Sequence, residues 1–179
     1  MNNIKKYKKG LLFFEANFLD KIISFEYEDA NSATKIVGIQ FKKQHFAHLC
    51  GIKYKFGAKK FFDDLKNGNV ATKDIIYNDR KDLVNAKADC MDCLATILKP
   101  GVRVCESGKF AHLEFDAALR TGRDILALAV KYQDNGFFVC NSLLNLKIFK
   151  DNQGQIKKSF QVTSVYSFDK KTRTKNIIF

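Results

Sequence analysis

The spacing of apolar residues divides the chain into a first part with helical periodicity and a second part with the alternation typical of strands. Apolar side chains recur every three or four positions in four segments, which predicts helices over residues 10–24, 42–50, 57–65 and 80–98. The run Thr34–Phe41 alternates between apolar and polar residues and predicts a first strand. Gly51, Gly68 and Pro100 follow the last three helical segments, as expected of residues that end helices. Asp79 stands where it can cap the fourth helix.

After Pro100 the pattern changes to short segments rich in Val, Ile, Phe and Tyr, separated by turn-forming residues. These segments predict strands at Val102–Glu106, Phe110–Asp116, Ile125–Lys131, Gly136–Phe149, Lys158–Phe168 and Asn176–Phe179. Residues 110–122 are ambiguous, because their Phe, Leu and Ala positions also fit a helix. A helical N-terminal half followed by a series of strands predicts an α+β fold with an antiparallel sheet covered on one face.

The chain is expected to form one domain. Its 179 residues are enough for one well-filled core, and 46% hydrophobic with 28% charged residues is typical of a globular protein. There is no internal repeat, and Pro100 is the only proline, so no Pro/Gly-rich linker separates two parts. We therefore expect a single domain over residues 1–179 with basic tails at both ends.

The charge of the chain is strongly positive and clustered. The formal net charge is +12, and residues 42–60 contain six lysines and no carboxylate. Such an excess attracts nucleic acid or an anionic membrane surface. A set of solvated lysines without a partner is the alternative. RNA, or another nucleic acid, is the expected partner, and a membrane is not, because no apolar run approaches the roughly 18 residues that span a bilayer.

The five cysteines are expected to be reduced. Their number is odd, and no segment resembles a signal peptide, so a cytoplasmic location is expected. Cys90 and Cys93 form a C-x-x-C motif, which raises a redox or zinc interpretation. Both fall on the apolar stripe of the predicted helix 80–98, and no second pair completes a zinc set, which favours core cysteines. No metal or cofactor is expected.

Two of the three histidines, His45 and His48, stand three residues apart in the predicted helix 42–50. At this spacing both can lie on one helical face, and histidine is the side chain best suited to proton transfer near neutral pH. The alternative is that one histidine faces the core and only the other is exposed. The third, His112, alternates with apolar residues in a predicted strand and is either a second catalytic histidine or a surface residue.

The order of these motifs resembles a nuclease family. The run Phe41-x-x-x-His45-Phe46-x-His48-Leu49-x-Gly51-Ile52 precedes the aromatic-rich segment Ala58–Leu65, and Phe137-Phe138-Val139-Cys140-Asn141-Ser142-Leu143-Leu144 comes much later. This arrangement resembles the fourth phage class of the Barnase–EndoU–Colicin–RelE-like (BECR) nucleases, over roughly residues 34–170. The family often has a proline where this chain has Cys140. The resemblance implies a barnase/RelE-like fold with a curved sheet, and RNA cleavage.

RNA cleavage without a metal requires a base for the 2′-hydroxyl, an acid for the leaving 5′-oxygen and fixed cations for the phosphoryl oxygens. The candidate catalytic residues are His48, His45, Lys109, Arg120 and Ser142, the last by its match to the Asn-Ser/Thr position of the family. The candidate nucleic-acid-binding residues are Lys42, Lys43, Lys53, Lys55, Tyr54, Arg123 and Tyr166. Most of the seventeen Phe and six Tyr are expected to build the core.

These features predict a metal-independent endoribonuclease acting as a toxin or as a phage or mobile-element effector, with a cognate antitoxin or immunity protein as a further partner. Two alternatives stay open. The first is a nucleic-acid-binding protein without catalysis on the same fold, and the second is a protein–protein module that binds an acidic partner.

Overall fold

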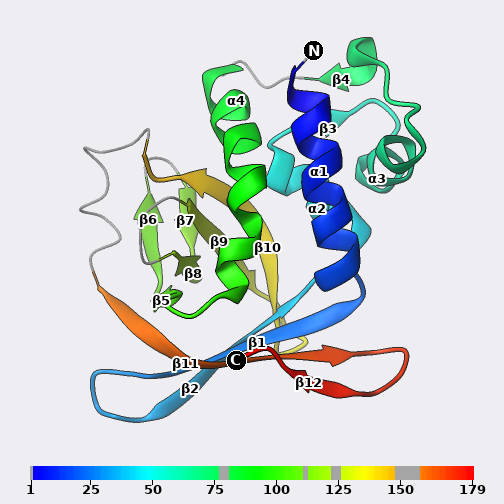
Figure 1. The fold of residues 1–179 in the computed structure, drawn as a ribbon. Helices are drawn as coiled ribbons and strands as arrows, with labels where there is room; N and C mark the ends of the chain where they lie inside the picture. Colours follow the sequence, from blue (N-terminus) through cyan, green and yellow to red (C-terminus); the bar gives the residue numbers. More distant parts are fainter. Residues whose placement is uncertain (1, 77–80, 111–112, 122–125, 148–157) are drawn as a thin grey trace.

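The computed structural model describes residues 2–76, 81–110, 113–121, 126–147 and 158–179 (Figure 1). Its helices are α1 (Asn2–Asn17), α2 (Lys43–Cys50), α3 (Ala58–Asn67) and α4 (Lys81–Cys90), with the 3-10 segments η1 (Thr72–Asp74) and η2 (Met91–Leu98). Its strands are β1 (Lys21–Glu28), β2 (Thr34–Gln40), β3 (Lys53–Tyr54), β4 (Ile75–Ile76), β5 (Arg103–Cys105), β6 (Gly108–Phe110), β7 (Leu113–Phe115), β8 (Ala117–Arg120), β9 (Leu126–Tyr132), β10 (Phe138–Asn145), β11 (Ser159–Asp169) and β12 (Lys175–Ile177). The predicted mixture of helices and strands is confirmed.

Eight strands form the main sheet, in the order β1-β2-β10-β9-β8-β5-β11-β12. β1 pairs with β2 on one side and with β11 on the other, so the sheet closes on itself, while β12 pairs with β11 alone. The described neighbours in this sheet are antiparallel except β2 and β10, which join Ile39 to Phe138 and Gln40 to Val139 in parallel. Two further pairs, β3–β4 and β6–β7, lie outside it.

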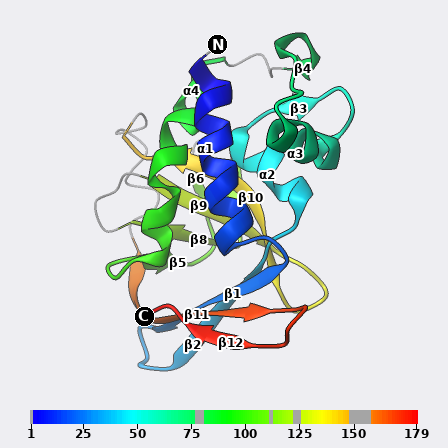
Figure 2. The ribbon, with the colours of Figure 1, turned by 45° about the vertical axis from the view of Figure 1, so that its right-hand side comes forward.

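The helices pack on one another and on the central strands of this sheet. Figures 1 and 2 show α1 and α4 side by side, with α2 and α3 next to α1 and with β11 and β12 at the opposite end of the molecule. α2 and α4 both contact β10. At the centre of the core, the fully buried ring of Phe14 lies 5.8 Å from that of Phe41 and 5.3 Å from that of Phe46 between centroids. Aromatic residues thus build much of the core, as expected.

The first helix differs from the predicted segment 10–24. α1 already begins at Asn2 and ends at Asn17, and β1 begins at Lys21. Asp20 between them has a positive φ of 60°, which interrupts the helical path. The helical spacing of Leu11, Phe14 and Phe18 continues to Ile22, whereas the alternation of apolar and polar residues that marks a strand starts only at Ile23. Because β1 and β2 precede α2, the predicted order of helices before strands holds only roughly.

The other helices lie where the pattern predicts them. Gly51 and Gly68 follow α2 and α3 in the left-handed conformation that ends a helix, with φ values of 69° and 77°. The predicted helix 80–98 is α-helical only to Cys90 and continues as η2 to Leu98. Asp79, its expected cap, lies outside the described residues.

The strands predicted after Pro100 are present with adjusted bounds. The segment 110–116 is divided between β6 and β7, and the described part of 110–122 contains strands β7 and β8 in place of a helix. The predicted strand 136–149 corresponds to β10. Both basic ends belong to the fold: the first lysines lie in α1, and the C-terminal segment pairs with β11, where the N–H of Val165 donates to the carbonyl oxygen of Phe179 at 2.8 Å.

Candidate functional site

His45 lies in the first turn of α2, and its side chain secures the connection from β2. The N–H of Lys42 donates to His45 Nδ1 at 3.2 Å, while the N–H of His45 donates to the carbonyl oxygen of Lys42 at 3.0 Å. The ring is buried, and this burial is the main cause that lowers the pKa of His45 from 6.5 to about 4, with smaller contributions from His48 and Lys42. A neutral His45 therefore fixes the start of the helix.

His48 lies in the last turn of α2 and is exposed to solvent. Its carbonyl oxygen accepts a hydrogen bond from the N–H of Gly51 at 3.0 Å, so His48 adjoins the turn that ends the helix. Of the two arrangements left open by the sequence, the structure has the second, because His45 faces the interior and His48 faces solvent.

Lys87 of α4 approaches the end of α2 from the neighbouring helix. Its Nζ donates to Ser142 Oγ of β10 at 2.8 Å. The register of β10 against β9 shifts between Cys140 and Ser142, which leaves Asn141 as an extra residue. Such bulges turn side chains out of the regular alternation of a strand and often occur next to active sites. Here the bulge immediately precedes the residue that binds Lys87.

Gly51 provides the space that Lys87 occupies. A Cβ atom at Gly51 would lie 2.5 Å from Lys87 Cδ and 3.2 Å from Lys87 Nζ, which is closer than atoms approach without displacement. The last carbonyl groups of α2 lie at this turn, and the partial negative charge of a helix C-terminus favours a cation there. We call Gly51, Lys87 and Ser142 the Lys87 cluster.

The Lys87 amine is partly withdrawn from water. Burial lowers the pKa of Lys87 below its ordinary value of 10.5, and the opposing influence is the nearby Cys50 thiol. The pKa of Cys50 is itself raised well above 9.0 by burial, so this thiol stays protonated. None of the ion pairs between described residues involves Lys87. Lys87 is therefore a half-buried amine whose identified polar partner is a hydroxyl group.

Two hydrogen bonds hold the elements around the Lys87 cluster together. Asn145 Nδ2 donates to the carbonyl oxygen of Ala86 at 3.1 Å and joins β10 to α4. The hydroxyl of Tyr7 lies 3.5 Å from the carbonyl oxygen of Cys50 and joins α1 to the end of α2. Lys87 and Ser142 thus lie on anchored elements, and Gly51 directly follows the anchored end of α2.

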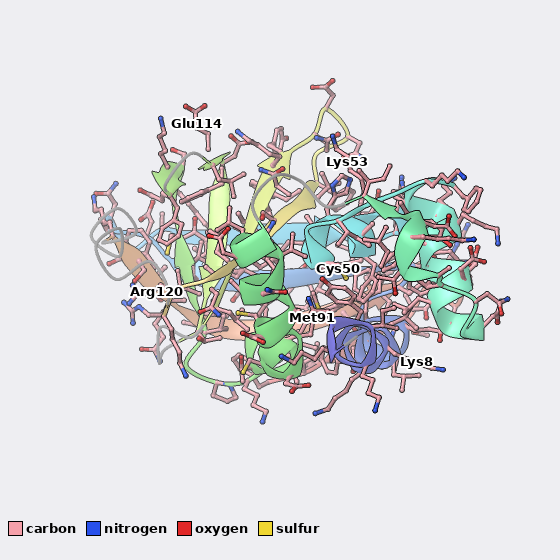
Figure 3. All side chains as sticks on the ribbon, turned by 90° about the horizontal axis from the view of Figure 1, so that it is seen from above. Lys8, Cys50, Lys53, Met91, Glu114 and Arg120 are labelled. Carbon is pink, nitrogen blue, oxygen red and sulfur yellow. The ribbon has the colours of Figure 1, made fainter. Side chains whose placement is uncertain are left out.

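The predicted catalytic residues Lys109 and Arg120 lie elsewhere. They belong to β6 and β8, which Figure 1 shows on the side of α4 that faces away from α2. Figure 3 likewise shows Arg120 on the other side of α4 from Cys50. Arg120 is half-buried and stands directly opposite Arg103 of β5 in the sheet. The structure therefore brings Ser142 to the end of α2 but not Lys109 or Arg120. The candidates His112 and Arg123 lie outside the described residues.

The predicted nucleic-acid-binding lysines are all exposed, whereas the tyrosines are covered to different extents. Lys42, Lys53 and Lys55 face solvent, and Lys43, also exposed, forms an ion pair with Asp63 at 2.7 Å.

Tyr54 does not present its ring for base stacking. It is only 6% exposed, and its hydroxyl donates to Asp64 Oδ2 at 2.9 Å. Burial, together with the Asp64 carboxylate, raises the pKa of Tyr54 to about 12. Tyr166 is half-buried, and Lys175 Nζ lies 3.9 Å from its ring centroid, so this lysine covers one face of the ring.

The cysteines behave as expected of a core. All five are free thiols, and Cys90 is buried, which raises its pKa to about 12. Cys93 is half-buried and packs against the core. Among the described residues, no group of three or more His, Cys, Asp or Glu side chains is arranged to hold a metal ion.

Lys87 was not among the residues predicted from the sequence, although its position carries a signal. It follows Leu83 by four residues and precedes Cys90 by three, which places it on the apolar stripe of the predicted helix. A lysine at such a position is either buried with a partner or directed into a site. Its partner Ser142 is 55 residues away in the sequence, so no local pattern connects the two.

These features define a small basic α+β protein in which an exposed histidine and a half-buried lysine both adjoin the turn at Gly51, a class suited to act on a polyanion. The chain belongs to the family described as phage-Barnase-EndoU-ColicinE5/D-RelE like nuclease4 (PBECR4), which it matches over residues 4–179. The family resemblance found in the sequence is thereby confirmed, over more of the chain than residues 34–170. Membership supports nuclease activity in general and nucleic acid as the substrate class.

No curated protein and no solved structure matches the chain. In the part of the chain that the structure describes, no helix has the length and apolar character needed to cross a membrane.

Proposed function

We propose that this nuclease is an endoribonuclease that cleaves RNA through attack of the ribose 2′-hydroxyl on the adjacent phosphate, with His48 transferring a proton. The observation that carries the proposal is the position of His48 at the Gly51 turn. The Lys87 side chain packs against the same turn, so His48 and a cationic side chain both adjoin Gly51. Family membership supports the nuclease class, whereas the RNA substrate and the role of His48 are our inference.

The reaction divides the chemical tasks among these groups. As the 2′-oxygen forms its bond to phosphorus, the bond to the 5′-oxygen breaks, one proton leaves the 2′-hydroxyl and another reaches the 5′-oxygen. We assign one of these two transfers to His48. Lys87 has three N–H donors, of which Ser142 accepts one, and the others are available to the phosphoryl oxygens as negative charge develops. Ser142 orients the amine, and His45 acts as a positioning residue that holds α2.

Exposed lysines near α2 provide the attraction for RNA. Lys42 precedes α2 and Lys53 follows it, both exposed and both without a carboxylate nearby in the sequence. Contacts of this kind to phosphates raise affinity through counterion release and make binding sensitive to salt.

The test is cleavage of single-stranded RNA in the presence of EDTA. We expect the wild type to cleave RNA but not the same sequence made with 2′-deoxyribose, since that substrate lacks the nucleophile. His48→Ala is expected to lose cleavage, whereas Gln44→Ala on the same helix serves as a matched control and retains it. Cleavage of the deoxyribose strand would overturn the RNA mechanism, and full activity of a folded His48→Ala protein would overturn the role of His48. Salt-sensitive RNA binding without cleavage would select a nucleic-acid-binding protein without catalysis.

We further propose that the enzyme acts as a toxin or phage effector with a cognate inhibitor protein as partner. The phage origin in the family description supports this context. Tight induction in a bacterial host should arrest growth and fragment total RNA, and a His48→Ala protein expressed at the same level should do neither. Normal growth with intact RNA from well-expressed wild type would contradict a toxic role.

A further inference from the structure

Phe56 is an exposed aromatic side chain in the most basic part of the chain. The residue is 54% exposed, although phenylalanine is usually buried. Lys53, Lys55 and Lys59 around it are all exposed, and the sequence from Lys53 to Lys60 contains no carboxylate. The site thus combines an accessible apolar ring with cations.

The ring of Phe56 is held in place by buried neighbours. It meets the ring of Tyr54 edge to face, with centroids 5.5 Å apart and planes at 73°. Tyr54 is anchored by its hydrogen bond to Asp64 Oδ2 at 2.9 Å, and the N–H of Gly57 closes the turn by donating to the carbonyl oxygen of Tyr54 at 2.9 Å. Because neighbouring groups already order the ring, a ligand that covers it loses little conformational entropy.

Cations and apolar surface continue beside Phe56. Lys55 Nζ lies 5.4 Å from the Phe56 ring centroid. Lys53 stands directly opposite Ile76 in the β3–β4 pair, so both side chains project from the same face, and Ile76 is 51% exposed. We call Lys53, Lys55 and Phe56 the Phe56 platform.

The Phe56 platform closely follows Gly51 of the Lys87 cluster in the chain. Phe56 comes five positions after Gly51, which limits the distance between them to at most about 18 Å for a fully extended backbone. A short length of single-stranded RNA spans such a distance. A strand cleaved at the Lys87 cluster can therefore also reach the platform.

We propose that Phe56 stacks on an unpaired base of single-stranded RNA while Lys53 and Lys55 contact its phosphates. Base stacking on an aromatic ring together with lysine contacts to the backbone is how many proteins bind single strands without sequence preference. In a duplex the base faces are already stacked on one another, so the platform selects unpaired RNA. The inference rests on the proposed function in one respect, namely that the bound strand continues to the Lys87 cluster.

The test measures binding of a fluorescent single-stranded RNA oligonucleotide by anisotropy, with cleavage blocked by His48→Ala in every protein. Adding Phe56→Ala should weaken binding about 5- to 150-fold, which corresponds to roughly 1–3 kcal/mol per stacked base. Phe56→Trp should preserve binding, and Phe56→Leu, which keeps an apolar side chain but no ring, should weaken it. The affinity for duplex RNA should change little.

The salt dependence of RNA binding distinguishes the contribution of the lysines from that of the Phe56 ring. Lys53→Gln and Lys55→Gln should each reduce the slope of binding against salt, whereas Phe56→Ala should leave that slope unchanged. Thermal unfolding of the Phe56 variants serves as a folding control.

Two results would overturn the proposed stacking: full RNA affinity in Phe56→Ala, or full RNA affinity in Phe56→Leu, which would show that binding does not need an aromatic ring. Because binding is measured without cleavage, these outcomes are independent of the proposed function. If the wild type fails to cleave RNA but binds it through Phe56, the result supports the Phe56 platform and contradicts the catalytic proposal.

Discussion

Lys87 Nζ and Ser142 Oγ form a hydrogen bond of 2.8 Å that joins helix α4 to the bulge of strand β10. The bond holds a half-buried amine beside the turn at Gly51. A lysine that served only to cover a helix would extend into water, where its charge is hydrated at no cost. The orientation of Lys87 is therefore the feature of this molecule that most calls for a chemical role.

Lys87→Met is expected to lose cleavage by roughly 10²–10³-fold, because it removes the cation assigned to the phosphoryl oxygens. Ser142→Ala should cost less, about tenfold or below, since it removes only the hydrogen bond that orients the amine. Single-turnover cleavage rates with saturating RNA measure both effects. A Lys87→Met protein as active as the wild type would remove Lys87 from the mechanism.

Lys87 should also affect stability in a way that depends on pH. Its pKa is lower in the folded protein than the ordinary 10.5, so with rising pH the folded state releases this proton before the unfolded chain does. The unfolded state then binds more protons, and the free energy of unfolding rises with pH in this window. Urea unfolding gives the free energy of unfolding of the wild type and of Lys87→Met at neutral and at alkaline pH. From neutral to alkaline pH, the value for the wild type should rise relative to that for Lys87→Met. A pH-independent difference would contradict the burial of the charge.

The lowered pKa of His45 predicts that the protein loses stability in mild acid. The pKa of His45 falls from 6.5 to about 4 on folding, so between these values the unfolded chain binds a proton that the folded protein excludes. Lowering the pH through this window should therefore reduce the free energy of unfolding by about 2–3 kcal/mol from this group. His45→Asn provides the control, because its side-chain oxygen can accept the Lys42 N–H but does not titrate. Equal acid sensitivity of both proteins would show that His45 is not the cause.

Gly51→Ala and Gly68→Ala form a matched pair. Both glycines have positive φ, 69° and 77°, so each substitution costs about 1–2 kcal/mol in backbone strain. A Cβ at position 68 meets nothing within 4 Å, whereas at position 51 it would displace Lys87. We expect both variants to lose stability in urea unfolding but only Gly51→Ala to lose cleavage. If Gly68→Ala impairs cleavage equally, the loss reflects general destabilisation and not the position of Lys87.

The sequence predicts the local structure around α2 well and its tertiary contacts poorly. The helix 42–50 and its end at Gly51 follow from periodicity and from a residue that tolerates positive φ. Which histidine faces solvent depends on how α2 rotates against β10 and α3, and a spacing of three residues does not determine that rotation. The role of Lys87 likewise depends on a bulge in a strand more than fifty residues later.

Strand β1 shows a different limit of sequence patterns. The helical spacing of α1 continues from Phe18 to Ile22 at the start of the strand, and the alternation of Ile23, Phe25 and Tyr27 with polar residues begins only after it, so the predicted helix extends past the end of α1. Arg120 and Lys109 were grouped with the histidines by residue type alone, and the fold separates them because β6 and β8 lie beyond α4. The chemical type of a residue indicates whether it can take part in catalysis, whereas the topology of the fold decides which of these residues lie close together.

The pairing of β1 with β11 has a consequence for the synthesis of this protein. Lys21 is opposite Asp169, so one of the first strands completes its hydrogen bonds only with one of the last. Val162 and Val165 of β11 also belong to the core that supports α2 and β10. While the ribosome is still making residues 159–169, the sheet stays open and this core stays unfilled, and such long-range pairing is slow to form. The sheet of this nuclease therefore closes only once β11 has been synthesised, although β1 is made long before it.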